Sequence, residues 1–384
     1  MGAAVGDWID VREAGGLQAA LDALPKGGGT IHVPTGRHEI ARPVSKTLAE
    51  GQHLFIVGEG RGSVLANTNT AGEPLLQISG VAGSWWPDLR MTIRDISFEG
   101  NHESGDALVM MFPNDALIDT CFFLGHGGHA IRLIPHGTNV VVRDCWLRDC
   151  KHGIRAENIH HLTLHGNQTR RLAGGQEQEE HVYLSWDCRE VRVVNNHFAY
   201  GKKSAIILDG TAQHVIANNT IEGFETAIEA RGSCDQKVRD RCRDIAIASN
   251  YLHADIGIRL IGECRGFAIT GNDFINNTRA AVLIEGGAGA GKHALTGNVV
   301  RKSVYGGAFF PLPRTVEGQG GFILGDAEDC IVTGNLLEAI VPGPGISAGP
   351  GGGRHIIANN RISAKAQALD IRSPACVVEH NLVA

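Results

Sequence analysis

From residue 167 onward, asparagine returns along this chain at a nearly regular interval. Each of these asparagines follows one short apolar segment and precedes another. By subtraction, successive positions lie 21 to 37 residues apart. A repeat of twenty-odd residues with some longer intervals is typical of a solenoid whose turns carry loop insertions. The repeated asparagines are Asn167, Asn196, Asn219, Asn250, Asn272, Asn298, Asn335, Asn360 and Asn381.

In the preceding repeats, the position equivalent to these asparagines is occupied by Asp95, Cys121 and Cys145. At a tight corner, asparagine accepts the left-handed backbone conformation, and its side-chain amide bonds to neighbouring turns. After each corner and turn comes an apolar strand with alternating side chains, such as 129–133 and 205–208. The pattern predicts an all-β, single-stranded parallel β-helix of about twelve turns.

Composition agrees with a thin coiled sheet, since aromatic residues make up only 5% of the chain and glycines number 51. The net charge is −6 without any block of Lys or Arg, so we expect no nucleic-acid partner. No apolar run approaches the ~18 residues of a membrane span, so we expect no membrane partner. Met1–Trp8 lacks the pattern of a signal peptide. We therefore expect a cytoplasmic protein if the chain is full length, and a secreted one if a signal was removed.

Five of the nine cysteines repeat with the turns. Cys121 and Cys145 share one slot, and Cys188, Cys242 and Cys264 share another, each just before a strand. Small residues stacked in this way are typical of a buried core in a reduced protein. The sequence contains no CxxC motif and no zinc-like cysteine spacing, so we expect no metal bound by cysteine.

Residues 1–45 are predicted to form an N-terminal cap, and residues 46–384 one continuous β-helix domain. Leu17, Ala20, Leu21 and Leu24 form one apolar face of a helix that covers the open end of the solenoid. The phrase LQAALDALPKGGGTIHVPTGRHEI, followed by HLFIVGEG, resembles the opening of pectate-lyase-superfamily proteins. That resemblance covers nearly the whole chain. It implies a right-handed parallel β-helix and a carbohydrate-active protein.

Three segments interrupt the repeat, at residues 168–180, 231–243 and 301–319. Long loops on one side of a rigid scaffold often carry function. If Ile131, Ile154 and their equivalents point inward, the residues that follow them point outward. The predicted outward stripe is Arg132, Arg155, Tyr183, Ile207, Glu229, Arg259, Leu283 and Ile323.

His181 and Tyr183 lie two residues apart and are predicted to share one exposed face. β-Elimination at a uronate needs a group that neutralises the carboxylate, a base for the C5 proton and an acid for the leaving oxygen. Arg, His and Tyr can supply these three roles, and C5 epimerisation uses the same groups without cleavage. The predicted catalytic residues are His181, Tyr183, Arg155, Asp209 and Glu229. The predicted substrate-binding residues are Arg132, Glu157, Glu180, Arg231, Arg259, His126 and Lys203.

The carboxylates support other chemistries. Glu157, Asp209 and Glu229 with Glu180 could supply the acid and the base or nucleophile of glycoside hydrolysis or transfer, or bind Ca²⁺. The segment around His126, with Asp106 and Arg155, is similar to the polygalacturonase family, but one acid of each of that family's pairs is missing. Residues 298–337 resemble the late turns of inulin fructotransferases, which are trimers.

The first hypothesis is a polysaccharide-active enzyme, a lyase on a uronate-containing polymer, that requires no cofactor except Ca²⁺ in the carboxylate-bound case. The second is a glycoside hydrolase or fructotransferase. The third is a non-catalytic glycan-binding or structural module. A homo-oligomer, with a trimer favoured, is expected because the chain ends at Ala384 directly after the last repeated asparagine.

Overall fold

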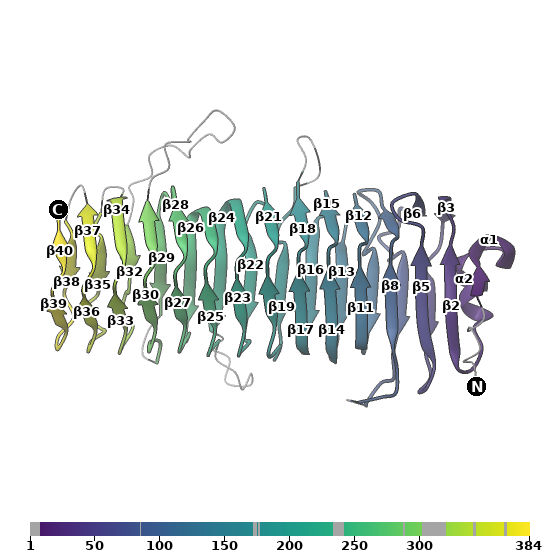
Figure 1. Ribbon diagram of the computed structural model, residues 1–384, viewed down its shortest axis with the longest axis horizontal. Helices are drawn as coiled ribbons and strands as arrows, with labels where there is room; N and C mark the ends of the chain where they lie inside the picture. Colours follow the sequence, from purple (N-terminus) through teal and green to yellow (C-terminus); the bar gives the residue numbers. More distant parts are fainter. Residues whose placement is uncertain are drawn as a thin grey trace, which may run out of the picture. The chain divides into compact units, whose positions relative to one another are not determined.

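The computed structural model describes residues 8–84, 86–171, 175, 177–232, 242–286, 289–301, 320–340, 343–364 and 367–384. These residues form two compact units, an N-terminal unit (Met1–Val182) and a C-terminal unit (Tyr183–Ala384). Most of the insertions at 231–243 and 301–319 lie outside the described residues, as does part of 168–180. Both units are built almost entirely of parallel strands, coloured by position in Figure 1.

The N-terminal unit is a solenoid whose typical turn supplies three strands, each paired in parallel with its equivalents in neighbouring turns. The first ladder contains β1 (Trp8–Asp10), β2 (Gly28–Val33), β5 (His53–Gly58), β8 (Met91–Arg94), β11 (Asn114–Asp119), β14 (Gly137–Arg143) and β17 (Ile159–His165). The second contains β3 (Gly36–Ile40), β6 (Ser63–Asn67), β9 (Ser97–Glu99), β12 (Phe122–Leu124), β15 (Trp146–Arg148) and β18 (Gln168–Arg170). The third contains β4 (Val44–Thr47), β7 (Leu76–Ser79), β10 (Leu108–Met111), β13 (His129–Ile134) and β16 (His152–Glu157).

The C-terminal unit repeats this arrangement, and it begins within β19 (Val182–Ser185). Its first ladder contains β20 (Arg192–Val194), β23 (Val215–Ala217), β25 (Ala246–Ala248), β27 (Ala268–Thr270), β30 (Ala294–Thr296), β33 (Ile331–Thr333), β36 (Ile356–Ala358) and β39 (Val377–Glu379). Its second contains β21 (His197–Ala199), β28 (Asp273–Ile275), β31 (Val299–Arg301), β34 (Leu336–Ile340), β37 (Arg361–Ala364) and β40 (Leu382–Val383). Its third contains β22 (Ser204–Asp209), β29 (Ala280–Glu285), β32 (Gly320–Ile323), β35 (Ile346–Ala348) and β38 (Leu369–Ile371). The long strands β24 (Thr220–Gly232) and β26 (Tyr251–Gly262) run through both the second and the third ladder.

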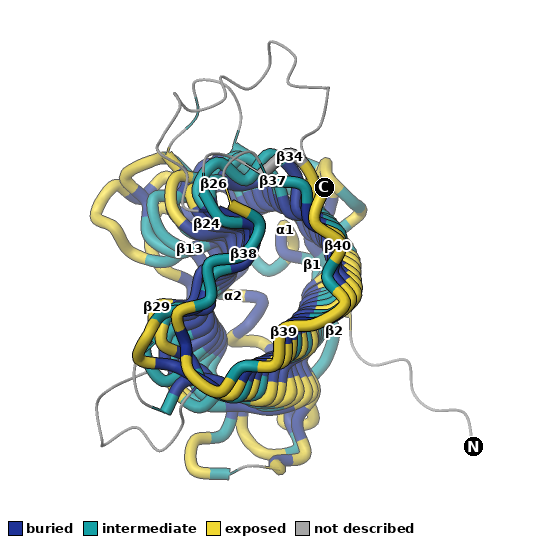
Figure 2. The backbone as a smooth tube through the Cα atoms, turned by 90° about the vertical axis from the view of Figure 1, so that its left-hand side faces the viewer, coloured by how far each residue is buried: buried dark blue, intermediate teal, exposed yellow. Residues whose placement is uncertain are grey.

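The prediction of a right-handed parallel β-helix is confirmed, with about 13 turns in the two units together. Within each unit, buried residues line the inner side of the coil, which Figure 2 shows in dark blue. Stacked rings such as Phe98 and Phe123, whose centroids are 4.9 Å apart, fill the interior. The described cysteines are free thiols, and all are buried except Cys376. None of the helices within the described ranges is long and apolar enough to cross a membrane.

The repeated asparagines are buried, except for the partly exposed Asn381, and they bond from turn to turn. The Oδ1 atom of Asn219 accepts hydrogen bonds from the backbone N–H and the side-chain Nδ2 of Asn196, at 2.9 and 3.0 Å. Its own Nδ2 donates to the carbonyl of Val193, at 2.8 Å. The column of asparagines therefore supplies hydrogen-bond partners to both backbone groups and side-chain amides inside the solenoid.

The left-handed conformation belongs to the residue before each repeated asparagine, and not to the asparagine itself as expected. Asn195, Asn218 and Gly271 have φ values of 58°, 56° and 63°. The chain turns at that residue, which leaves the next side chain pointing inward. By the same rule Asp95, with φ of 57°, is the corner residue, and the buried Ile96 occupies the ladder slot instead.

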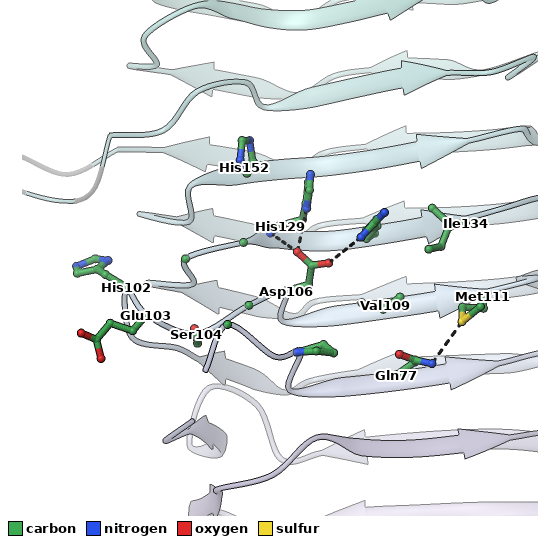
Figure 3. Close-up of a pocket in the computed structure, with 16 residues that line it drawn as sticks. Gln77, His102, Glu103, Ser104, Asp106, Val109, Met111, His129, Ile134 and His152 are labelled. Carbon is green, nitrogen blue, oxygen red and sulfur yellow. Dashed lines mark hydrogen bonds and ion pairs between the residues drawn. The ribbon is translucent and has the colours of Figure 1, made fainter. Parts of the chain in front are cut away.

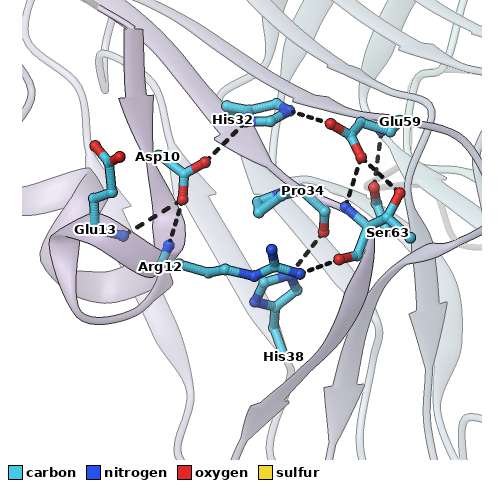
Figure 4. A network of polar contacts seen from close by, with 9 residues as sticks. Asp10, Arg12, Glu13, His32, Pro34, His38, Glu59 and Ser63 are labelled. Atoms are coloured by element: carbon cyan, nitrogen blue, oxygen red, sulfur yellow. Dashed lines mark hydrogen bonds and ion pairs between the residues drawn. The ribbon is translucent and has the colours of Figure 1, made fainter.

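The N-terminal segment forms α1 (Val11–Ala14) and α2 (Leu17–Asp22). The predicted helix is present but ends at Asp22, so Leu24 follows it, although its side chain is also buried. Asp10 caps α1 by accepting from the backbone N–H of Arg12 at 2.8 Å, and it bonds His32 Nδ1 at 3.1 Å (Figure 4). That this segment covers the end of the solenoid stays a prediction.

Candidate functional site

The strand register agrees with the predicted phase of the outward stripe. In the N-terminal unit Arg132 pairs with Arg155, and the residues before them, Ile131 and Ile154, also pair and are buried. In the C-terminal unit the paired positions run Ile207, Glu229, Arg259, Leu283 and Ile323. The exposure of this second stripe is lower than expected, because Ile207, Glu229 and Leu283 are all 5% exposed or less.

A cavity of about 610 Å³ lies beside the third ladder of the N-terminal unit. Its lining includes Asp106, His129, Arg132 and His152, several of which are labelled in Figure 3. Asp106 Oδ1 accepts from the backbone N–H of His129 at 2.7 Å and lies 2.9 Å from His129 Nδ1. Asp106 Oδ2 lies 3.7 Å from Arg132 Nη1. The aspartate therefore fixes both an imidazole and a guanidinium at the wall of the cavity.

The charge of Asp106 follows from these contacts. Burial raises the pKa of the Asp106 carboxyl, but the hydrogen bonds from His129 and the charges of His129 and Arg132 outweigh it. The net result is a lowered pKa, so Asp106 is an anion at neutral pH.

Further ionic contacts continue on the next turn of the N-terminal unit. Arg155 Nε donates to Glu157 Oε1 at 2.7 Å, and Arg132 Nη2 lies 4.0 Å from the same oxygen. His152 Nδ1 lies 2.8 Å from Glu180 Oε1. The predicted substrate-binding residues Arg132 and Glu157 thus lie together, while the Glu180 carboxylate is engaged by a histidine.

A second cluster lies in the C-terminal unit. The Tyr183 hydroxyl donates to Asp209 Oδ2 at 2.7 Å. Asp209 pairs in register with Arg231, whose Nε donates to Glu229 Oε1 at 2.5 Å. Glu229 also accepts from the Ser204 hydroxyl at 2.9 Å. The structure therefore brings Tyr183, Asp209, Glu229 and Arg231 together.

Arg231 and Arg259 are the cations of this cluster. Burial lowers the pKa of Arg231, but its hydrogen bond to Glu229 and the charges of Glu229, Tyr183 and Asp209 outweigh it and raise the pKa overall. Arg259 Nε donates to Glu285 Oε2 at 2.6 Å, and this bond raises its pKa as well. Both side chains are partly exposed, at 41% and 28%, and remain cationic at neutral pH.

Two predicted histidines are corrected by their burial. His181 precedes β19, its side chain is fully buried, and its Nδ1 contacts the hydroxyl of Thr169, so the prediction that it shares an exposed face with Tyr183 is wrong. His126 is also buried, with Nε2 3.3 Å from the carbonyl of Phe98. Burial lowers the pKa of His126 to about 4, so it is neutral and shielded from any substrate. Lys203, in contrast, is exposed just before β22.

Sequence reasoning missed the histidines of the cavity. His129 and His152 occupy the same slot on successive turns and pair in register, which their spacing of 23 residues already indicated. Their rings stack with centroids 4.7 Å apart. The exposed Trp186, which follows β19 in the C-terminal unit, was also missed.

The family model of NosD, described as a periplasmic copper-binding protein, matches residues 124–290, which is less than half of the chain. Among curated proteins, none matches this sequence closely enough to count as a relative. Solved structures match over much more of its length. The A-module of the mannuronan C-5 epimerase AlgE6 from Azotobacter vinelandii is 15% identical with a TM-score of 0.63, covering 98% of this chain and 99% of that one.

Two other solved structures belong to different carbohydrate-active proteins. An alginate lyase from Paenibacillus is 12% identical with a TM-score of 0.52, covering 76% of this chain and 97% of that one. A DFA-IIIase from Arthrobacter chlorophenolicus is 11% identical with a TM-score of 0.59, covering 98% of each chain. At this level of identity, the likenesses show that this chain shares the right-handed parallel β-helix fold with them.

Proposed function

We propose that this protein is a polysaccharide-active enzyme that cleaves a uronate-containing polymer by β-elimination at the Tyr183 cluster. The observation that carries the proposal is the 2.7 Å hydrogen bond from the Tyr183 hydroxyl to Asp209, with Arg231 in register beside Asp209. Two proteins of the same fold support the substrate class, since one is named as a mannuronan epimerase and the other as an alginate lyase. Both names refer to polymers of uronates.

The proposed reaction uses three side chains. Arg231 binds the substrate carboxylate and stabilises the negative charge that develops when C5 loses its proton. Asp209 accepts the C5 proton, the C4–O bond breaks as the C4=C5 double bond forms, and Tyr183 donates its hydroxyl proton to the leaving oxygen. The hydrogen bond between Asp209 and Tyr183 then returns the proton to the phenolate. Asp209 thus takes the role of base that the sequence had assigned to His181.

The remaining charged residues bind and position. Glu229 is only 5% exposed and accepts hydrogen bonds from Ser204 and Arg231, so we assign it to the orientation of Arg231. This burial argues against Glu229 as one half of a hydrolytic pair with Asp209. Arg259, in the same unit as the Tyr183 cluster, supplies a further cation for the carboxylates of the polymer.

The test is an assay of polymannuronate, other polyuronates and neutral glycans, including fructans, read by ultraviolet absorbance and reducing-end release together. We expect absorbance on a polyuronate, because elimination leaves a C4=C5 double bond. Tyr183→Phe and Asp209→Asn should each lower the rate at least about 100-fold, as expected for loss of an acid or base. Tyr251→Phe, which removes a hydroxyl elsewhere in the C-terminal unit, is the matched control and should retain the rate. Parallel reactions with Ca²⁺ and with a chelator reveal any need for that ion.

Other outcomes point to other reactions. Exchange of the C5 hydrogen with deuterated solvent, without absorbance, would indicate an epimerase. Reducing ends without absorbance would indicate a hydrolase, and new oligosaccharides with neither signal a transferase. Binding without turnover on any polymer would overturn the enzymatic proposal in favour of a glycan-binding module.

A further inference from the structure

A second group of side chains in the N-terminal unit has the composition of a metal site. His129, His152 and Glu180 each offer one ligand atom, and these three atoms all lie within 4.8 Å of one another. His129 and His152 come from paired positions of β13 and β16, and Glu180 follows on the chain after β18. The side chains of His129, His152 and Glu180 are only 14%, 20% and 10% exposed. The cluster is therefore partly shielded from water while two of its members line the cavity.

The orientation of the His129 ring is fixed by Asp106. Its Nδ1 lies 2.9 Å from Asp106 Oδ1, and that carboxylate also accepts from the His129 backbone N–H (Figure 3). Because the Asp106 carboxylate engages Nδ1, the other ring nitrogen, Nε2, is the one that is available to a ligand. A carboxylate that orients a histidine in this way is the usual outer partner of a metal-bound imidazole.

His129 Nε2 is itself a second, independent observation. This atom is buried, and among the described residues it has no hydrogen-bond partner. A buried polar atom without a partner costs about 1–3 kcal/mol, so its retention at this place calls for a ligand. The 2.8 Å hydrogen bond between His152 and Glu180 accounts for the placement of these two side chains without a metal. It does not account for the placement of His129, whose ring stacks on that of His152.

We propose that His129, His152 and Glu180 bind one divalent transition-metal ion such as Zn²⁺. Two imidazole nitrogens and one carboxylate oxygen are a donor set that Zn²⁺ prefers, and three protein ligands leave one position open. With Zn–N and Zn–O distances near 2.1 Å, a tetrahedral site needs ligand atoms about 3.4 Å apart. The three ligand atoms lie within 4.8 Å of one another, so the side chains have to adjust when the metal binds. The metal takes the place of the proton shared by His152 and Glu180, and the fourth position is open to a ligand from the cavity.

The first experiment titrates the full chain, stripped of metal by a chelator, with Zn²⁺ in a calorimeter. We expect one equivalent to bind, and His129→Gln, His152→Gln and Glu180→Gln each to weaken the affinity at least tenfold. His197→Gln is the matched control, since His197 Nε2 lies 3.2 Å from Glu222 Oε1 but, among the described residues, this pair belongs to no group of three close ligand atoms. This variant should bind Zn²⁺ like the parent protein. Asp106→Asn should weaken binding about 10- to 100-fold through the orientation of His129.

A Co²⁺ titration of the same proteins tests the ligand types independently of stability. Tetrahedral Co²⁺ with nitrogen and oxygen ligands gives visible bands but no strong thiolate charge-transfer band, which would report capture by a cysteine instead. Circular dichroism of each variant shows whether it has folded. The proposal is overturned if no saturable Zn²⁺ binding occurs, if the thiolate band appears, or if folded His129→Gln and His152→Gln bind as tightly as the parent.

Discussion

Replacement of Asn272 by alanine should destabilise the C-terminal unit strongly, because this one side chain joins three turns. Its Oδ1 accepts from the backbone N–H and the Nδ2 of Asn250, both at 3.0 Å. Its Nδ2 donates to the carbonyl of Ile247 at 2.8 Å and to Asn298 Oδ1 at 3.1 Å. All of these atoms lie inside the solenoid, where water does not replace the lost partner.

The size of the destabilisation depends on which buried groups are left without any hydrogen-bond partner. The two side-chain atoms that lose a bond to Asn272 each keep another, since Asn250 Nδ2 still donates to Ile216 and Asn298 Oδ1 still accepts from the backbone N–H of residue 272. The backbone N–H of Asn250 loses the bond that Asn272 gives it, whereas Ile247 remains in the parallel pairing of β25 with β27. At about 1–3 kcal/mol for the one buried group left without a partner, the loss in free energy of unfolding is about 1–3 kcal/mol.

The assay is urea unfolding followed by far-ultraviolet circular dichroism, combined with amide hydrogen exchange. The exchange measurement is needed because the turns of a solenoid can open locally. Thr270→Ala is the control two residues away, since Thr270 is exposed and its hydroxyl lies 3.1 Å from the Thr296 hydroxyl. A loss below about 1 kcal/mol for Asn272→Ala, with unchanged exchange at Asn250, would refute the reasoning.

Three further predictions concern other parts of the chain. Burial lowers the pKa of His126 from 6.5 to about 4. The contribution of neutral His126 to the free energy of unfolding is therefore complete above pH 6.5, and about 3 kcal/mol is lost as the pH falls toward 4. With falling pH, the urea midpoint of His126→Gln should decrease less steeply than that of the parent or of the exposed-site control His380→Gln. Burial raises the pKa of the Cys150 thiol to about 12, so an alkylating reagent applied to the native protein should modify Cys376 much faster than Cys150, as peptide mass spectrometry will show. If the proposed function holds, Trp186, which is 69% exposed, offers a stacking surface for a sugar ring, and Trp186→Ala should raise KM for the polymer several-fold with little change in kcat.

Much of the fold was predictable because a solenoid repeats its local constraints. The interval between asparagines gave the parallel β-helix, and the alternation after Ile131 and Ile154 gave the outward phase of Arg132 and Arg155. The sequence could not show that the corner falls one residue before each asparagine. For that reason Asp95 was placed in the ladder slot that Ile96 occupies.

The candidate sites were less predictable, since they depend on where each strand begins and what the loops cover. His181 looked exposed from its spacing to Tyr183, but β19 starts one residue later and the His181 side chain lies against Thr169. The pairing of Glu180 with His152 could not be read from the sequence either, because residues 168–180 interrupt the repeat between them. By contrast, Tyr183 and Asp209 were both predicted to be catalytic residues, and the structure brings their side chains into contact.

The spacing of the solenoid explains why both candidate sites consist of residues from neighbouring turns. Adjacent turns lie about 4.8 Å apart, so identical side chains at equivalent positions of neighbouring turns can stack, as His129 stacks on His152. Side chains at neighbouring positions can pair with a different type, as Tyr183 pairs with Asp209. The two sites use separate side chains in separate units of the chain. Tyr183→Phe should therefore abolish elimination yet leave the affinity for Zn²⁺ unchanged. If this single variant lost both properties while still folded, the assignment of acid chemistry to Tyr183 and metal binding to His129, His152 and Glu180 would have to be abandoned.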